Sequence, residues 1–184
     1  MVDNCNTKEH VVSRRAFLQL GSATLITLTL PPILRKVGMP MTLTARAAAF
    51  ERKVIGKVSE LKVGESISFQ YPYDHISANN FLIMLESEAG GGVGPDKNIV
   101  AFHSLCTHQG GPMAGTFHGD GIAGPCPLHL TTFDLNRHGM VIAGHATVAL
   151  PQIMLEVDGD DIVATGVLGL IYGYQDNAVD PATL

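Results

Sequence analysis

The sequence predicts an all-β fold, and three observations carry this prediction. After residue 50, short apolar and β-branched runs recur along the chain and are separated by turn-forming residues. No apolar pattern with the period of an α-helix continues beyond Leu34. Near the carboxyl end, Asp158-Gly159 separates two such runs, and an Asp-Gly pair favours the turns that join antiparallel strands. An antiparallel β-sandwich or barrel is therefore expected.

The expected strands are short and follow one another with few interruptions. They cover residues 54–58, 66–71, 81–85, 99–102 and 140–143, and then the hairpin arms 153–157 and 161–167. The glycine-rich stretch 90–95 lacks the Gly-Lys-Ser/Thr ending and the following helix of a phosphate-binding loop, so we interpret it as a loop between two strands. The apolar run 167–172 is too short to span a membrane. It is expected to be a core strand, or a strand shared with a partner subunit.

Residues 1–49 differ from the rest of the chain and are interpreted as an export signal. Arg14 and Arg15 lie in a stretch that resembles a twin-arginine signal, which predicts a periplasmic location. The apolar run that follows, 16–30, is shorter than the ~20 residues that a membrane-spanning helix requires. Cleavage is expected after Ala47 or Ala49, and retention of the segment as a membrane anchor stays open. Residues 50–184 are expected to form one domain.

The charge of the chain is divided unevenly between these two parts. The whole chain carries a formal charge of −5, whereas the part after residue 50 contains 6 basic and 15 acidic residues. An acidic body argues against nucleic acid and against anionic lipid as partners. A basic redox protein would be attracted to it, although the same acidity also serves solubility.

Two short segments carry the residues suited to metal chemistry. Cys106-Thr107-His108 and Cys126-Pro127-Leu128-His129 each contain one Cys and one His, and seventeen residues separate the two segments. The remaining cysteine, Cys5, lies in the export signal. Two Cys and two His can bind a structural zinc ion, or a [2Fe-2S] cluster in which two histidines replace two cysteines on one iron. Zinc sites usually pair Cys with Cys and His with His, so the mixed pairs favour the cluster.

The spacing of these residues resembles that of the Rieske family, and the resemblance extends through Gly110-Gly111, Gly124-Pro125 and Phe133-Asp134. It implies a Rieske-type antiparallel β-sandwich or barrel with an inserted, loop-rich subdomain that binds the cluster. The stretch of about 102–147, which is rich in Gly, Pro, Thr and His, is the expected insertion. The resemblance also implies four ligands. Cys106 and Cys126 would hold one iron, while His108 and His129 would hold the other and form the electron port.

Several residues depart from the best-known members of that family, the Rieske subunits of cytochrome bc complexes. Gly111 and Leu128 stand where those proteins carry the two cysteines of a disulfide between the ligand loops. Thr131 and Phe133 stand where they place a Ser and a Tyr whose hydroxyls donate to the sulfur atoms. The hydroxyl of Thr131 can keep the first of these hydrogen bonds, whereas Phe133 has no hydroxyl and cannot make the second. We therefore expect a reduction potential below the top of the Rieske range of about −150 to +300 mV.

The export signal, Gly111 and the stretches 150–153, 159–162 and 166–173 together resemble the small subunit of arsenite oxidase. This resemblance implies a molybdopterin-containing large subunit, which oxidises arsenite and passes electrons through its own iron-sulfur cluster to the Rieske centre. It implies a c-type cytochrome or a small copper protein as electron acceptor, and no substrate chemistry in this chain. It also places His145 in a third loop over the cluster, where it could tune the potential or contact a partner.

Other functions stay open at this point. The chain could serve a related molybdenum enzyme that acts on another oxyanion, or a cytochrome bc complex. A free-standing Rieske ferredoxin would not need the export signal. A Rieske oxygenase would need a further iron site of two His and one carboxylate, for which we expect no room.

Overall fold

The computed structural model describes residues 50–180, which form nine β-strands, three short 3-10 turns and no α-helix. The all-β prediction is confirmed. The export-signal interpretation, with its twin-arginine motif and cleavage sites, falls on residues 1–49 and lies outside the described residues. None of the helical turns within residues 50–180 has the length and apolar character needed to cross a membrane.

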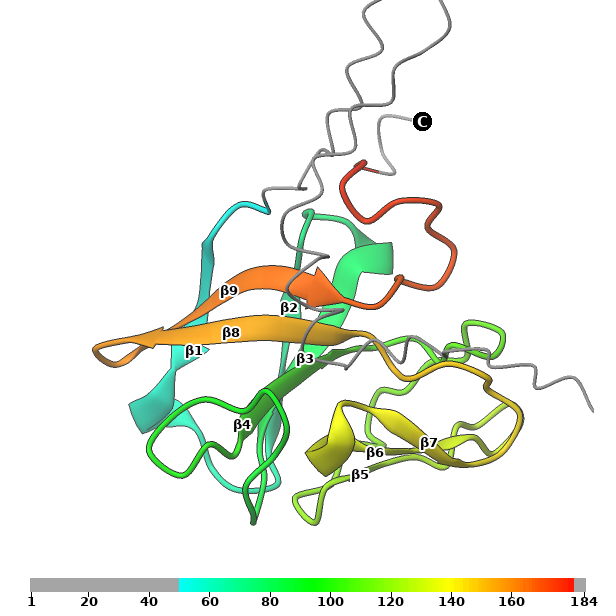
Figure 1. The fold of residues 1–184 in the computed structure, drawn as a ribbon, viewed down its shortest axis with the longest axis horizontal. Helices are drawn as coiled ribbons and strands as arrows, with labels where there is room; N and C mark the ends of the chain where they lie inside the picture. The colour runs from blue at the N-terminus through cyan, green and yellow to red at the C-terminus, as the bar shows by residue number, and fades with distance from the viewer. Residues whose placement is uncertain (1–49, 181–184) are drawn as a thin grey trace, which may run out of the picture. The chain divides into compact units, whose positions relative to one another are not determined.

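Six of the strands form one antiparallel sheet in the order β1-β9-β8-β4-β3-β2 (Figure 1). The Nζ atom of Lys53, on β1, donates to the backbone oxygen of Gln70, on β2, at 3.0 Å. This bond bridges the two edge strands, so the sheet is nearly closed into a barrel. The strands are β1 (Lys53–Lys57), β2 (Ser66–Gln70), β3 (Asn79–Met84), β4 (Ile99–His103), β8 (Gln152–Asp158) and β9 (Asp161–Leu168).

The remaining strands form a small antiparallel sheet in the order β5-β6-β7 (Figure 1). They are β5 (Ile122–Ala123), β6 (Thr132–Asp134) and β7 (Met140–Ala143). The 3-10 turn η4 (Leu135–Arg137) follows β6, while η2 (Val58–Glu60) and η3 (Ile76–Ala78) belong to the large-sheet part. All three small-sheet strands come after β4 and before β8 in the chain. The loop-rich subdomain is thus an insertion into the large sheet.

Strand β4 separates two hydrophobic cores. All five of its residues are buried, which explains why its sequence is almost continuously apolar. Successive side chains of a strand point to opposite faces. Val100 and Phe102 accordingly pack in one core, and Ile99 and Ala101 in the other. Full burial of a side chain such as Phe102 contributes about 1.5–3 kcal/mol.

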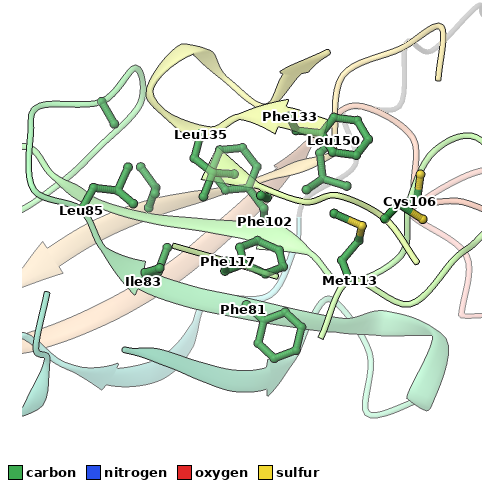
Figure 2. Packing of buried hydrophobic residues seen from close by; sticks show 14 residues of the cluster. Phe81, Ile83, Leu85, Phe102, Cys106, Met113, Phe117, Phe133, Leu135 and Leu150 are labelled. Carbon is green, nitrogen blue, oxygen red and sulfur yellow. The ribbon is translucent and has the colours of Figure 1, made fainter. Parts of the chain in front are cut away.

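The core that contains Phe102 also contains Cys106 and Cys126 (Figure 2). Cys106 lies at one end of the labelled row of side chains in Figure 2, and Leu85 lies at the other. The two cysteines are therefore part of the packed interior, in contact with the hydrophobic residues that join the insertion to the large sheet.

Most of the expected strands are present, with shifted ends. The hairpin β8–β9 is confirmed, but its loop consists of Gly159 and Asp160, because Asp158 pairs with Asp161. The glycine-rich stretch 90–95 lies between β3 and β4, as expected. The prediction of a strand over 167–172 was wrong for most of its length. Strand β9 ends at Leu168, and Gly169 follows with a φ of +91°, a conformation that interrupts a strand.

Candidate metal centre

The two ligand segments lie in loops with the same backbone pattern. In the first loop, the N–H of Cys106 donates to Gly111 and the N–H of Gly110 donates to Cys106, at 2.8 and 2.9 Å. In the second loop, the N–H of Cys126 donates to Thr131 and the N–H of Leu130 donates to Cys126, also at 2.8 and 2.9 Å. The backbone of each cysteine is thus hydrogen-bonded to the backbone of the residues four and five positions after it.

The fourth residue after each cysteine has a left-handed backbone. The φ angles of Gly110 and Leu130 are +68° and +62°. This conformation is ordinary for glycine but uncommon for leucine. The repeated hydrogen bonds and the repeated left-handed turn give the two loops one shape. Each loop therefore presents its cysteine and its histidine in a similar way.

The two thiols are buried and unpaired. Cys106 is 1% exposed and Cys126 is 2% exposed, and neither forms a disulfide. Burial raises the pKa of the Cys106 thiol, and the neighbouring Cys126 raises it further. The backbone N–H of His108 and the hydroxyl of Thr131 both donate to the Cys106 sulfur, which lowers that pKa. These donors are suited to a sulfur that carries negative charge.

The two imidazoles meet edge to face. The ring centroids of His108 and His129 are 4.7 Å apart, and the rings are nearly perpendicular at 85°. His129 is exposed and His108 is half-buried. Desolvation lowers the pKa of His108, and the nearby His129 and His145 lower it further. The His108 ring is therefore more readily neutral, as a metal ligand must be.

One atom of this group has no partner. Nδ1 of His108 is buried and makes no hydrogen bond. A buried polar atom without a partner costs about 1–3 kcal/mol, so such atoms are rare without a functional reason. A metal ion bound to Nδ1 would supply the missing partner. Two buried thiols and two adjacent imidazoles match the ligand set of a [2Fe-2S] cluster with two histidines.

Thr131 joins the second ligand loop to the third loop. Its side chain is fully buried, and its Oγ1 atom accepts the backbone N–H of His145 at 3.2 Å. The same hydroxyl donates to Cys106, so one side chain links the third loop to the thiol of the first ligand segment. Phe133, two residues later, is fully buried in the core that contains both cysteines. It has no hydrogen-bonding group to offer a sulfur.

His145 completes a group of three imidazoles. Its ring centroid lies 5.5 Å from that of His108 and 6.4 Å from that of His129. The sequence prediction placed this residue over the cluster site, and the structure brings it there. Within residues 50–180, no group of three His, Cys, Asp or Glu side chains is placed to hold a single metal ion.

Gly111 packs directly against the second ligand loop. A Cβ atom at this position would lie 2.6 Å from the Cys126 sulfur and 3.2 Å from the Leu128 side chain. The side chain of Leu128 therefore covers Gly111 and joins the two ligand loops by an apolar contact. The described cysteines, Cys106 and Cys126, are both free.

Comparison with known proteins identifies the family. The model of the Rieske [2Fe-2S] domain matches residues 51–154, which include both ligand loops and most of the large sheet. The chain belongs to the Rieske family. A Rieske domain binds a [2Fe-2S] cluster, so the group that the four side chains fit is this cluster.

Several relatives of this Rieske chain are similar over most of its length. It is 54% identical to the iodate reductase subunit IdrB of Denitromonas iodatirespirans over 167 residues, which cover 90% of this chain and 86% of the relative. It is 51% identical to the iodate reductase subunit IdrB of Pseudomonas sp. strain SCT over 173 residues, 93% and 88% of the two chains. A cytochrome bc1 Rieske subunit of Streptomyces coelicolor is 28% identical over 190 residues, 83% of this chain and 50% of that subunit.

A solved structure agrees with the Rieske fold. The soluble domain of Rieske protein II of Sulfolobus acidocaldarius aligns with a TM-score of 0.54 and 21% identity, over 64% of this chain and 78% of that one. This likeness concerns the fold alone.

Two residues near the Rieske site had no signal in the sequence. The ring of Tyr172 lies against Gly110, although the two are far apart in the chain. His103, at the end of β4, is fully buried and bonded to Asn80 at 3.2 Å. The expected strand 99–102 ended one residue too early, because β4 continues to His103 and both faces of the strand are covered.

Proposed function

We propose that this chain is the electron-transfer subunit of an exported oxyanion oxidoreductase whose large subunit contains molybdopterin. The observation that carries the proposal is the 54% identity to an iodate reductase subunit, over 90% of this chain. A protein named as a subunit works in a larger assembly, so a catalytic partner is part of the proposal. When bound, the [2Fe-2S] cluster supplies one-electron transfer.

In this proposal, two cysteines and two histidines bind the two irons of the cluster. Cys106 and Cys126 hold one iron, and His108 and His129 hold the other. Support comes from burial, because both thiols lie in the core while His129 is exposed. A redox partner can approach the imidazoles closely, whereas the thiols are insulated by the protein interior. Electrons would therefore enter and leave on the histidine side.

Iodate is the oxyanion that we favour. The two relatives that carry the name iodate reductase are 54% and 51% identical and span the ligand loops. In an iodate reductase, a c-type cytochrome or a small copper protein would reduce this chain, and the large subunit would then take the electrons.

Arsenite is the second candidate. It rests on the resemblance of Gly111 and of the stretches 150–153, 159–162 and 166–173 to the small subunit of arsenite oxidase. With arsenite the electrons would run in the opposite direction, from the large subunit through this chain to the cytochrome or copper protein. The direction of electron flow therefore distinguishes the two candidates.

Export by the twin-arginine route is part of the same proposal, which places the complex in the periplasm. Arg14 and Arg15 support it, together with the apolar run behind them. Replacing both arginines with lysine should keep the chain in the cytoplasm with its cluster assembled. Fractionation of the host cells, with detection of the tagged chain, tests this step and shows whether the mature protein stays with the membrane.

Low-temperature electron paramagnetic resonance on the complex, purified from its host through a tag on this chain, tests the substrate. In one sample arsenite is the only reductant. In another, the cluster is first reduced with ascorbate, the excess ascorbate is removed, and iodate is then added. The isolated chain, loaded with its cluster but free of other subunits, receives the same additions, because iodate could oxidise the cluster without an enzyme.

The outcomes separate the candidates. Loss of the reduced Rieske signal with iodate in the complex, but not in the isolated chain, supports iodate reduction. A signal that grows with arsenite supports arsenite oxidation instead. If ascorbate gives the signal and neither oxyanion changes it, both substrate assignments fall and the cluster remains. A purified complex without molybdenum would overturn the proposed partner.

A further inference from the structure

A short segment after β9 is fixed to the large sheet. We call residues 169–174 the C-terminal strap. Ile171 is fully buried, and its N–H donates to the Asn177 side chain at 3.0 Å. The other end of that side chain, Nδ2, donates to the backbone oxygen of Gly169 at 2.7 Å. One amide side chain therefore holds the strap at two points.

Two tyrosine hydroxyls also tie this region to the rest of the domain. The hydroxyl of Tyr174 is hydrogen-bonded to Ser77 at 3.0 Å, and that of Tyr73 donates to the backbone oxygen of Asn177 at 3.1 Å. Tyr73 and Ser77 belong to the connection between β2 and β3. The strap and the residues that follow it are thus hydrogen-bonded to the connection between β2 and β3.

From this fixed strap, the side chain of Tyr172 reaches the first ligand loop. A Cβ atom on Gly110 would lie 2.5 Å from Cε1 and 2.7 Å from Cδ1 of the Tyr172 ring. The ring edge therefore occupies the space that a side chain at position 110 would need. Gly110 is the residue whose N–H closes the loop onto Cys106 at 2.9 Å. Movement of the ring would free the turn that carries both Cys106 and His108.

A second contact holds the same loop on another side. The hydroxyl of Thr107, between the two ligand residues, donates to the backbone oxygen of Val148 at 2.9 Å. The equivalent turn of the second loop is less covered, since the Leu130 side chain is 66% exposed. The turn at Gly110 is thus held by Tyr172 and Thr107, while the second loop is held elsewhere, through Thr131 and the N–H of His145.

We propose that Tyr172 is a positioning residue for the cluster, which acts by pressing the C-terminal strap against Gly110. Its ring lies against Gly110, the residue that closes the first ligand loop onto Cys106. It fixes the turn that orients the Cys106 sulfur and the His108 ring. The inference rests on the Rieske cluster and not on the substrate of the complex.

Four variants of the full chain, each loaded with its cluster, test the proposal. Tyr172→Phe keeps the ring, Tyr172→Leu and Tyr172→Ala remove it, and Leu170→Ala removes an exposed side chain of the same strap. Removing a contact that orients the ligands of a metal site lowers the affinity for the metal by on the order of tenfold. We therefore expect Tyr172→Ala to lose its visible absorption on the order of tenfold faster in the presence of an iron chelator. Its paramagnetic resonance lines should also broaden and its midpoint potential should move.

The variants distinguish positioning from general stability. The phenylalanine and Leu170→Ala proteins should match the wild type in all three measurements. The proposal is overturned if Tyr172→Ala matches the wild type, or if Leu170→Ala is equally damaged, because the effect would then belong to the strap as a whole. If the alanine variant does not fold, the leucine variant decides in the same way.

Gly110→Ala approaches the same contact from the other side. Its Cβ would collide with the ring, and the left-handed backbone adds strain of its own. In the double variant with Tyr172→Ala, the ring is absent, so the collision does not occur and only the backbone strain at position 110 remains. The double variant should therefore lose its cluster more slowly than the product of the two single effects predicts. If the double variant instead loses its cluster at the rate given by the product of the two single effects, the two residues act independently and the proposed contact is not supported.

Discussion

Gly111 lies directly against the Cys126 sulfur, because a Cβ atom on Gly111 would approach that sulfur to 2.6 Å. Gly111→Ala should therefore displace the sulfur or the loop that carries it. Inserting a methyl group into a packed site costs about 1–3 kcal/mol. We expect a lower iron content per chain and a melting temperature several degrees below that of the wild type, measured by metal analysis and calorimetry.

Gly166→Ala is the matched control for this variant. It also adds one methyl group, and the nearest atom would be the sulfur of Met154 at 3.2 Å, at the flexible end of a side chain. This variant should keep its iron. Full iron content in Gly111→Ala as well would show that the second ligand loop adapts, and the packing argument would then fail.

Thr131→Val should lower the reduction potential of the cluster. The Thr131 hydroxyl donates to the Cys106 sulfur, and a donor to sulfur stabilises the reduced, more negative state. Removing one such donor should lower the potential by about 50 mV, or roughly 1 kcal/mol for a one-electron couple. Thr131→Ser keeps the hydroxyl and should stay close to the wild type in a redox titration. Equal shifts in both variants would assign the effect to packing.

Phe133→Tyr should change the potential in the opposite direction. Phe133 is fully buried in the core that contains both cysteines, and a hydroxyl there could donate to a sulfur. One added donor should raise the potential by roughly 50 mV. Phe133→Leu supplies no donor and should not raise it. A titration of the tyrosine variant without a rise would show that the hydroxyl does not reach the sulfur.

Much of the fold followed from the sequence because its signals are local. Alternating and apolar runs mark β1, β2, β3, β4, β7 and the β8–β9 hairpin within a few residues. The cysteines and histidines of the site were equally visible, since each ligand pair lies within four residues and the loops are rich in glycine. Strands β5 and β6 were not predicted, because two and three residues are too few to show a period.

The contacts that cross the fold were not visible in the sequence. The strap that carries Tyr172 reads as the end of an apolar strand, and only the left-handed turn at Gly169 directs it to the first ligand loop. The bonds of Thr131 to both Cys106 and His145 depend on how three loops meet. Neither arrangement leaves a trace in local patterning, because each joins residues that are distant in the chain.

The buried histidine of β4 is a further example of such a contact. The side-chain amide of Asn80 donates to the backbone oxygens of Tyr71 and Ala78, at 2.9 and 2.8 Å. Its oxygen is therefore left to accept from Nδ1 of His103, which must carry the proton. Nε2 of His103 is buried without a hydrogen-bond partner, so a second proton would have no acceptor.

This burial should make the domain less stable in mild acid. Burial lowers the pKa of His103 from 6.5 to about 4. As the pH falls below 6.5, the unfolded chain takes up the proton first, so stability is lost down to about pH 4 and no further below it. Between pH 7 and pH 4.5 this should lower the free energy of unfolding by roughly 2–3 kcal/mol.

The variant His103→Gln can still donate a hydrogen bond to Asn80 but does not titrate. Urea unfolding at the two pH values should therefore show a smaller acid loss in the variant, while protonation of the cluster ligands affects both proteins alike. Equal losses in the two proteins would mean that His103 is not held neutral in the folded state.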